Sequence, residues 1–104
     1  MSDINGLIRA ANEGHTETVN RLLAIDAIMA QATSFDNYAL RLAAWNGHTE
    51  IVNRLLEIDA VVKQAAADDN AALRAAARKG HTETVKILLI RGYMVPDLNR
   101  RHMI

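Results

Sequence analysis

Cysteine is absent from this 104-residue sequence, and its absence excludes disulfide bonds, thiolate catalysis and cysteine-based zinc sites together. An excess of charge of one sign is missing too, because 12 basic residues balance 12 acidic ones. A balanced chain is a poor bulk binder of nucleic acid or of membrane surfaces, which need a basic excess. Long hydrophobic runs are also lacking, and no stretch approaches the roughly 18 uncharged apolar residues of a membrane span.

Aromatic residues are scarce as well: the chain has one Trp, two Tyr and one Phe, although half of its residues are apolar. Alanine and leucine dominate the apolar residues, and they favour close-packed helices, whereas β-branched and aromatic residues favour sheets. The length suits one domain over residues 1–104. The polar start Met1-Ser2-Asp3 does not resemble a signal peptide, so we expect a cytoplasmic location.

The balanced charge conceals an asymmetry between the halves of the chain. Residues 1–52 hold three Lys or Arg against six Asp or Glu, and residues 53–104 hold nine against six. The basic residues of the C-terminal end are Arg74, Arg78, Lys79, Lys86, Arg91, Arg100 and Arg101. Such a cluster can contact phosphates, but no aromatic residues are interleaved with it along the sequence, and a solvated helix face explains it more simply. Nucleic-acid binding by this end is kept as an alternative.

The strongest positive signal is an internal repeat. Gly-His-Thr-Glu occurs at residues 14–17, 47–50 and 80–83, which are 33 residues apart both times. Segments 14–32 and 47–65 agree at 14 of 19 positions. A fixed period of this length is typical of a solenoid, in which each repeat buries its apolar face only against its neighbours.

The pattern within one repeat is helical. In the middle repeat Leu40, Ala43 and Ala44 lie at i, i+3 and i+4, which places a small-residue face toward a neighbouring helix. Gly47 is expected to end that helix in a left-handed conformation, and Thr49 is expected to cap the next one. The buried stripe of this second helix is predicted to be Val52, Leu55 and Leu56. The predicted helix pairs span about 5–13 and 16–25, 38–46 and 49–58, and 71–79 and 82–91.

These features resemble the ankyrin-repeat family, whose 33-residue unit has two antiparallel helices and the core pattern Ala-Ala-x-x-Gly-His…Val-x-x-Leu-Leu. The resemblance covers about residues 3–95. It implies an all-α, ankyrin-like solenoid of about three helix-turn-helix repeats, at about 3–35, 36–68 and 69–95. It also implies a protein–protein interaction module that binds its partner through a concave face, built from the first helices and the loops before them.

The chain departs from the family pattern in two places. The family's opening Thr-Pro-Leu-His is replaced by residues 38–41 and 71–74, so Asp36-Asn37 and Asp69-Asn70 are expected to act as substitute caps. The family's Gly-Ala-Asp-Val-Asn finger is replaced by residues 25–32 and 58–65, which contain no glycine or proline. We therefore predict that the β-hairpin fingers are lost or replaced by short helical turns, N-capped by Asp26 and Asp59. Such units are similar to those of ankyrin proteins from intracellular bacteria, so delivery into a host cell is an alternative location.

No arrangement of residues in the sequence favours catalysis or metal binding. His15, His48 and His81 occur once per repeat, so they would form a ladder rather than converge on one ion. We expect each to bond locally where two helices meet. The serines lack the context of a nucleophile, and the glycines are spaced by the repeat rather than gathered in a phosphate-binding loop. The sequence therefore predicts a non-enzyme without cofactor, metal or small-molecule substrate.

Candidate partner-binding residues follow from the family resemblance. The concave face would include the two positions before each glycine and parts of the preceding loops. These candidates are Asn12, Glu13, Phe35, Asn37, Trp45, Asn46, Arg78 and Lys79. Trp45 is the sharpest, because its repeat equivalents Asn12 and Arg78 show that the stack needs no indole there. The alternatives are that Trp45 covers neighbouring alanines or stacks on Arg78, and that Phe35 plugs the core.

The C-terminal end of the stack carries unusual apolar residues. Ile87 and Ile90 stand where the middle repeat has Arg54 and Glu57, which adds two apolar residues to an outward face. We predict that residues 96–104 fold back as a cap over a monomer, with a weak homodimer through this end as the second choice. A structural or engineered repeat scaffold without a natural ligand is the main functional alternative.

Overall fold

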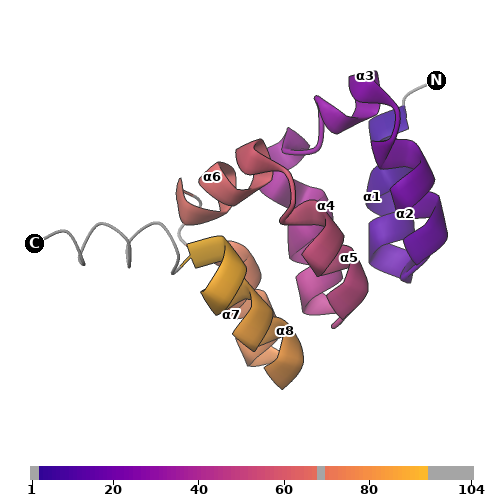
Figure 1. The fold of residues 1–104 in the computed structure, drawn as a ribbon. Coiled ribbons are helices and arrows are strands. Elements are labelled where there is room, and N and C mark those ends of the chain that lie inside the picture. The colour runs from indigo at the N-terminus through magenta and orange to yellow at the C-terminus, as the bar shows by residue number, and fades with distance from the viewer. Residues whose placement is uncertain (1–2, 68–69, 94–104) are drawn as a thin grey trace, which may run out of the picture.

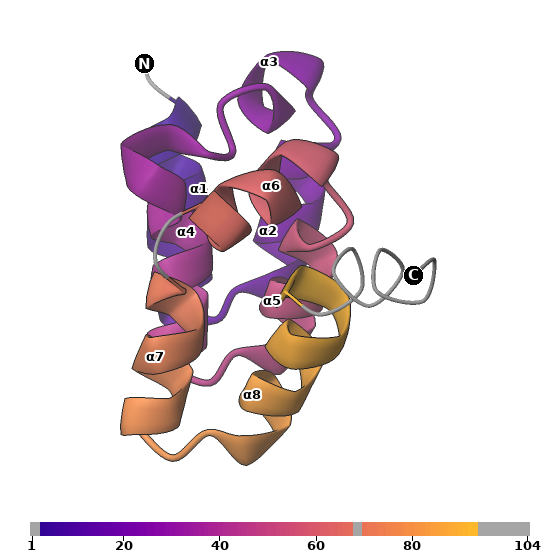
Figure 2. The ribbon, with the colours of Figure 1, turned by 90° about the vertical axis from the view of Figure 1, so that its left-hand side faces the viewer.

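A computed structural model of the chain describes residues 3–67 and 70–93, and within these ranges the chain is helical without any strand. Three first helices form one layer and three second helices form another (Figures 1 and 2). The first helices are α1 (Asp3–Glu13), α4 (Ser34–Trp45) and α7 (Ala71–Arg78). The second helices are α2 (Thr16–Leu23), α5 (Thr49–Leu55) and α8 (Thr82–Ile87). Each helix packs against its equivalent in the next repeat. This confirms the predicted all-α, ankyrin-like solenoid.

The core between the two layers is built from small and branched apolar residues. Ala43, Ala44 and Ala76 are fully buried, which allows the first helices to approach closely, as the repeated alanines predict. Val52, Leu55 and Leu56 form the predicted buried stripe of α5 and are at most 5% exposed. The alanine excess of the sequence is thus explained by close helix pairs.

Short helices replace the hairpin fingers, as predicted. They are α3 (Asp26–Met29) and α6 (Asp59–Ala67), each of which lies at the upper end of its own helix pair in Figure 1. Ile28 and Val61 anchor them in the core. The predicted N-cap role of the aspartates is wrong, because each is the first residue of its helix, and Ile25 occupies the N-cap of α3. In the first turn a carboxylate still interacts favourably with the helix dipole.

The third helix pair ends differently from the other two. From Leu88 to Tyr93 the chain continues as a π-helix, η1, which packs against α6 and α8. Gly92 stands where Asp26 and Asp59 begin the finger helices of the earlier repeats. The predicted helix over residues 82–91 is therefore an α-helix followed by a π-helix.

A histidine bound to the preceding repeat joins successive units. Gly14 and Gly47 have φ values of +80° and +72°, the left-handed conformation expected after a first helix. The His48 ring lies against Gly14, and its Nε2 lies 3.1 Å from the main-chain oxygen of Asn12. His81 repeats this contact against Gly47. His48 and His81 therefore act structurally, as predicted, but each bonds to the repeat before its own.

Thr49 does not cap α5. The N-cap of that helix is His48, and it makes no side-chain capping hydrogen bond. Thr49 is the first helical residue, and its hydroxyl oxygen lies 3.0 Å from that of Thr84 in the next repeat. This contact between Thr49 and Thr84 links α5 to α8.

A left-handed turn interrupts the start of α4. Phe35, Asp36 and Asn37 have φ values of 58°, 58° and 60°. Among the described residues, neither Asp36 nor Asn37 makes a capping hydrogen bond to the helical turns that follow this kink, and Oδ1 of Asn37 is buried without a partner. Asn37 is 1% exposed, and its Nδ2 donates to the main-chain oxygen of Val61 at 2.9 Å. Partner binding by Asn37 stays a prediction; in this structure its buried amide fastens α6 to α4.

Replacing Asp36 by glycine is expected to stabilise the fold by up to about 1 kcal/mol. A non-glycine residue is strained at positive φ, whereas glycine adopts that conformation freely. The Asp36 side chain is exposed, so its removal leaves the core intact. Asp26→Gly, at the first position of α3, is the control and should destabilise by about 0.5–1 kcal/mol, because it also removes the carboxylate that interacts with the helix dipole. Urea denaturation measures both, and a loss of stability with Asp36→Gly would contradict the expectation.

The outward face of the last repeat is only partly as predicted. Ile90 is 62% exposed, but Ile87 is partly buried and packs against the core. The predicted cap over residues 96–104 lies outside the described residues. The weak homodimer through this end stays a prediction.

Candidate binding surface

Three of the four aromatic residues belong to α4. Phe35, Tyr38 and Trp45 are 64%, 37% and 40% exposed, so each shows a substantial part of its ring to solvent. From Tyr38 to Trp45 the spacing is seven residues, which returns the side chain to the same side of the helix. The outer side of the first-helix layer therefore carries an aromatic strip.

Two hollows beside this strip form one groove across the first helices. The first hollow, of about 380 Å³, is lined by Asn5, Ile8, Phe35, Tyr38 and Arg41. The second, of about 230 Å³, is lined by Tyr38, Arg41, Leu42, Trp45, Ala71 and Ala75. Tyr38 and Arg41 line both hollows, so the two adjoin each other at this pair of residues. We call this surface the first-helix groove.

Arg41, in the middle of the groove, is held in place by the left-handed turn. Its Nε donates to the main-chain oxygen of Asp36 and its Nη2 to that of Phe35, both at 3.0 Å. Its guanidinium carbon lies 5.1 Å from the centre of the Tyr38 ring. The turn directs carbonyl groups at Arg41, so the cation and the ring are positioned before any ligand arrives.

Trp45 is fixed from two sides. Its main-chain oxygen accepts a hydrogen bond from Nε2 of His81 at 3.0 Å. The Nζ of Lys79 lies 4.9 Å from the centre of the indole ring. In the alternative that Trp45 stacks on a cation, the predicted partner Arg78 is therefore wrong. The next residue in the chain, Lys79, supplies the cation.

The other predicted residues are placed less favourably for binding a partner. Asn46 donates through Nδ2 to Oδ1 of Asn12 and to the main-chain oxygen of Leu42, both at 2.9 Å. Glu13 lies 3.7 Å from Nδ1 of His15. Arg78 is exposed near the end of α7. The structure thus joins Asn12 and Asn46 to each other and leaves Trp45, Lys79 and Phe35 as the predicted residues most closely associated with the aromatic strip.

Sequence reasoning missed Tyr38 and Arg41. Both fall in the segment 38–41, which replaces the family's Thr-Pro-Leu-His and lacks its capping threonine. The available signal was the spacing of Tyr38, Arg41 and Trp45 along one helix, at i, i+3 and i+7. This spacing places an arginine between two aromatic residues on one helix face.

Two cations, Arg41 in the groove and Lys79 over the Trp45 ring at its edge, have no carboxylate partner among the described residues. Ion pairs among the described residues join Glu17 to Arg21, Glu57 to Arg54 and Glu13 to His15. Arg41 and Lys79 contact aromatic rings, and within the described ranges neither contacts a carboxylate. Lys79, one of the basic residues of the third repeat, thus has an aromatic neighbour, Trp45 of the second repeat. The order of residues in the sequence does not reveal this contact.

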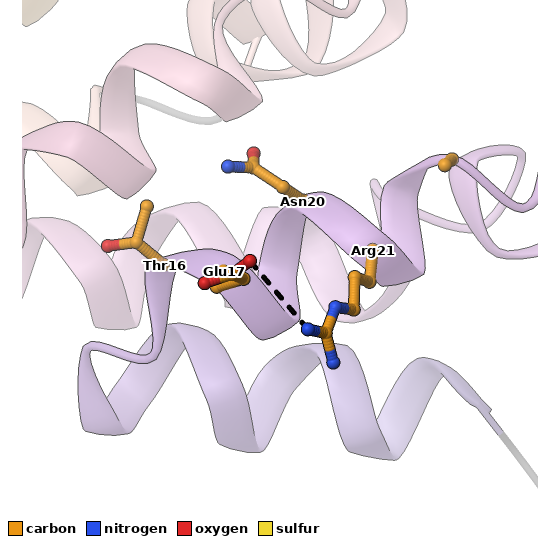
Figure 3. Close-up of a pocket in the computed structure, with 5 residues that line it drawn as sticks. Thr16, Glu17, Asn20 and Arg21 are labelled. Carbon is orange, nitrogen blue, oxygen red and sulfur yellow. Dashed lines mark ion pairs between the residues drawn. The ribbon is translucent and has the colours of Figure 1, made fainter.

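A larger hollow, of about 540 Å³, lies over α2 but has a different character. Figure 3 shows Thr16, Glu17, Asn20 and Arg21 around it, with Glu17 and Arg21 pointing toward each other. Their 3.7 Å ion pair joins side chains that are 81% and 78% exposed. A pair of this kind contributes little in water, so this is a solvated helix face. Across residues 3–67 and 70–93, no group of three His, Asp or Glu residues is arranged to hold a metal ion.

The family comparison agrees with this architecture. A family model described as "Ankyrin repeats (3 copies)" matches residues 7–101. The chain therefore belongs to the ankyrin-repeat family, whose members are generally protein–protein interaction modules and typically not enzymes. No curated protein and no solved structure matches the chain. Over the described part of the chain, no helix has the length and apolar character that crossing a membrane requires.

Proposed function

We propose that this chain binds a protein partner through the first-helix groove, with Trp45 as its main contact residue. The observation that carries the proposal is the exposed aromatic strip of Phe35, Tyr38 and Trp45 on one helix. Tryptophan, tyrosine and arginine are the residue types enriched among the side chains that dominate interface energies. The groove combines all three types in adjoining positions.

The stack itself does not require these aromatic residues. Trp45 has Asn12 and Arg78 as its repeat equivalents, and Tyr38 has Asn5 and Ala71. Polar and small residues at the same sites leave the helices packed in the same way, so packing between repeats does not explain the rings. Exposed apolar surface that the fold does not need is typical of an interaction site.

Trp45→Ala is expected to abolish most partner binding while leaving the fold stable. The substitution removes the contact with Lys79, which contributes about 0.5–1 kcal/mol at an exposed site. The hydrogen bond from His81 uses the Trp45 main chain and survives. At a central interface position, truncation weakens binding by about 2 kcal/mol or more, roughly thirtyfold. Affinity capture from cell extract with quantitative mass spectrometry, beside a thermal melt, measures both effects.

Met29→Ala is the matched control, because Met29 is 39% exposed, like Trp45 at 40%, but lies on α3 outside the groove. A genuine partner is retained by the wild type and by Met29→Ala, and lost with Trp45→Ala and Tyr38→Ala. If every captured protein is retained by all variants, the groove is not the binding site. If the wild type captures nothing above background, the interpretation as a scaffold without a natural ligand is favoured.

A further inference from the structure

We infer that the segment bound by the first-helix groove is an acidic peptide segment with a large apolar side chain. The inference rests on the proposed function and adds the chemistry of the partner. Two independent features carry it: a small apolar hollow between two rings, and two cations, one in the groove and one at its edge, that have no carboxylate partner in the described structure.

The apolar requirement comes from the hollow between Tyr38 and Trp45. Its volume is about 230 Å³, and Leu42, Ala71 and Ala75 contribute to its lining. Small-molecule sites usually exceed about 300 Å³, so this hollow suits one large side chain better than a ligand. The hollow forms between two repeats because the small alanines of α7 lie opposite the bulky rings of α4. An aliphatic or aromatic side chain entering it would remove the exposed ring surface from water.

The acidic requirement comes from Arg41 and Lys79. Arg41 uses Nε and Nη2 for the two carbonyl groups of the turn, which leaves further N–H donors in its planar head for a carboxylate. Within residues 3–67 and 70–93, the Lys79 ammonium lies over the Trp45 ring without a carboxylate partner, and it has three donors. Asp36 presents its main-chain oxygen to Arg41 rather than its carboxylate. The groove therefore offers fixed positive charge to an incoming anion.

A peptide fits these features better than a single-stranded nucleic acid does. Base stacking needs open ring faces, but Arg41 already lies over Tyr38 and Lys79 over Trp45. The apolar lining by Ile8, Leu42 and the alanines contributes nothing to phosphate binding. The chain as a whole also carries no net positive charge. Aliphatic side chains and carboxylates together match what the groove presents.

The test selects peptides without bias and then measures charge dependence. A displayed library of random twelve-residue peptides is selected on the full wild-type chain, and the enriched peptides are synthesised. We expect Asp or Glu beside Leu, Phe or Trp in the enriched set. Fluorescence anisotropy then compares each acidic peptide with its amide version, in which Asn and Gln replace Asp and Glu. The amide version is expected to bind about tenfold more weakly at low salt, and the difference should shrink as salt is added.

Lys79→Gln identifies the cation involved and preserves the fold, because the Lys79 side chain lies over an exposed ring. It is expected to weaken binding of the acidic peptide about threefold, as for the loss of one exposed ion pair, and to leave the affinity for the amide version unchanged. Lys86→Gln, on exposed α8, is the matched control and should change neither affinity. Arg41→Gln is a second test whose folding is checked by circular dichroism.

The outcomes separate this inference from the proposed function. Enriched peptides that are basic or uncharged, yet lose binding with Trp45→Ala, would refute the acidic partner and keep the groove as a peptide site. Enriched peptides that bind the Trp45→Ala variant with the same affinity as the wild type would refute both the acidic partner and the groove as the binding site. An oligothymidylate that displaces the peptides, with Trp45-dependent and steeply salt-sensitive binding, would replace the peptide by a nucleic acid.

Discussion

Gly47→Ala is expected to destabilise the stack by about 2–4 kcal/mol, whereas Gly80→Ala should cost only about 1 kcal/mol. The two glycines end equivalent helices and have nearly the same φ, +72° and +77°. Any L-residue is strained in that conformation, so both substitutions carry this penalty. Only the surroundings of the two positions differ.

The difference arises from His81. A Cβ on Gly47 would lie 2.7 Å from Nδ1 of the His81 ring, too close for the ring to stay. Displacing the ring breaks its hydrogen bond to the Trp45 carbonyl and leaves that carbonyl unsatisfied, which costs about 1–3 kcal/mol. Next to Gly80, by contrast, no described atom lies within 4 Å of an added Cβ.

Urea unfolding followed by far-ultraviolet circular dichroism measures both free energies. His81→Ala combined with Gly47→Ala completes a double-mutant cycle, and we expect the pair to lose less than the sum of the single losses. Equal losses for Gly47→Ala and Gly80→Ala would show that the histidine does not hold the junction between repeats.

Asn37→Ala is expected to lose about 2–3 kcal/mol of unfolding free energy, and Asn70→Ala less than about 1 kcal/mol. Both asparagines occupy the same repeat position with left-handed φ values of 60° and 57°. Asn37 is buried and donates to the Val61 carbonyl, while Asn70 is exposed and makes no side-chain capping bond. Removing the Asn37 amide leaves the Val61 carbonyl without its donor and opens a space beneath α6.

Hydrogen exchange of the amides in α6 and the same urea titration test this expectation. Asn37→Asp is the sharper variant, because it keeps the shape of the side chain but replaces the donor by a carboxylate oxygen facing a carbonyl. We expect it to lose at least as much stability as Asn37→Ala. Identical stability of Asn37→Ala and Asn70→Ala would contradict the role of Asn37 as a link between α4 and α6.

Much of the fold could be predicted because it depends on local rules. The 33-residue period, the glycine that ends each first helix and the helical fingers follow from repeat spacing, backbone sterics and the absence of turn residues in 25–32 and 58–65. The capping predictions for Thr49, Asp26 and Asn37 failed. A polar residue near the start of a helix can cap the helix, can be its first residue, or can bond to a neighbouring repeat. The sequence looks the same in all three cases.

The candidate site was only partly predictable. Comparison of repeats singled out Trp45, because the equivalent positions hold asparagine and arginine. Stacking on Arg78 was one alternative for Trp45, whereas the structure places Nζ of Lys79 over the ring. Arg41 belongs to the groove through bonds to a left-handed turn, and no pattern in the sequence indicates that three successive non-glycine residues adopt it.

The sequence by itself determined the repeat, the helix pairs, their core and the loss of the hairpins, since these depend on residues close together in the chain. The tertiary structure alone decided which side chains meet across repeats: His81 with the Trp45 carbonyl, Lys79 with the indole, and Asn37 with Val61. Such contacts depend on the rotation and offset between stacked helices. That geometry is set by the packing of all the small core residues together, so no single segment encodes it.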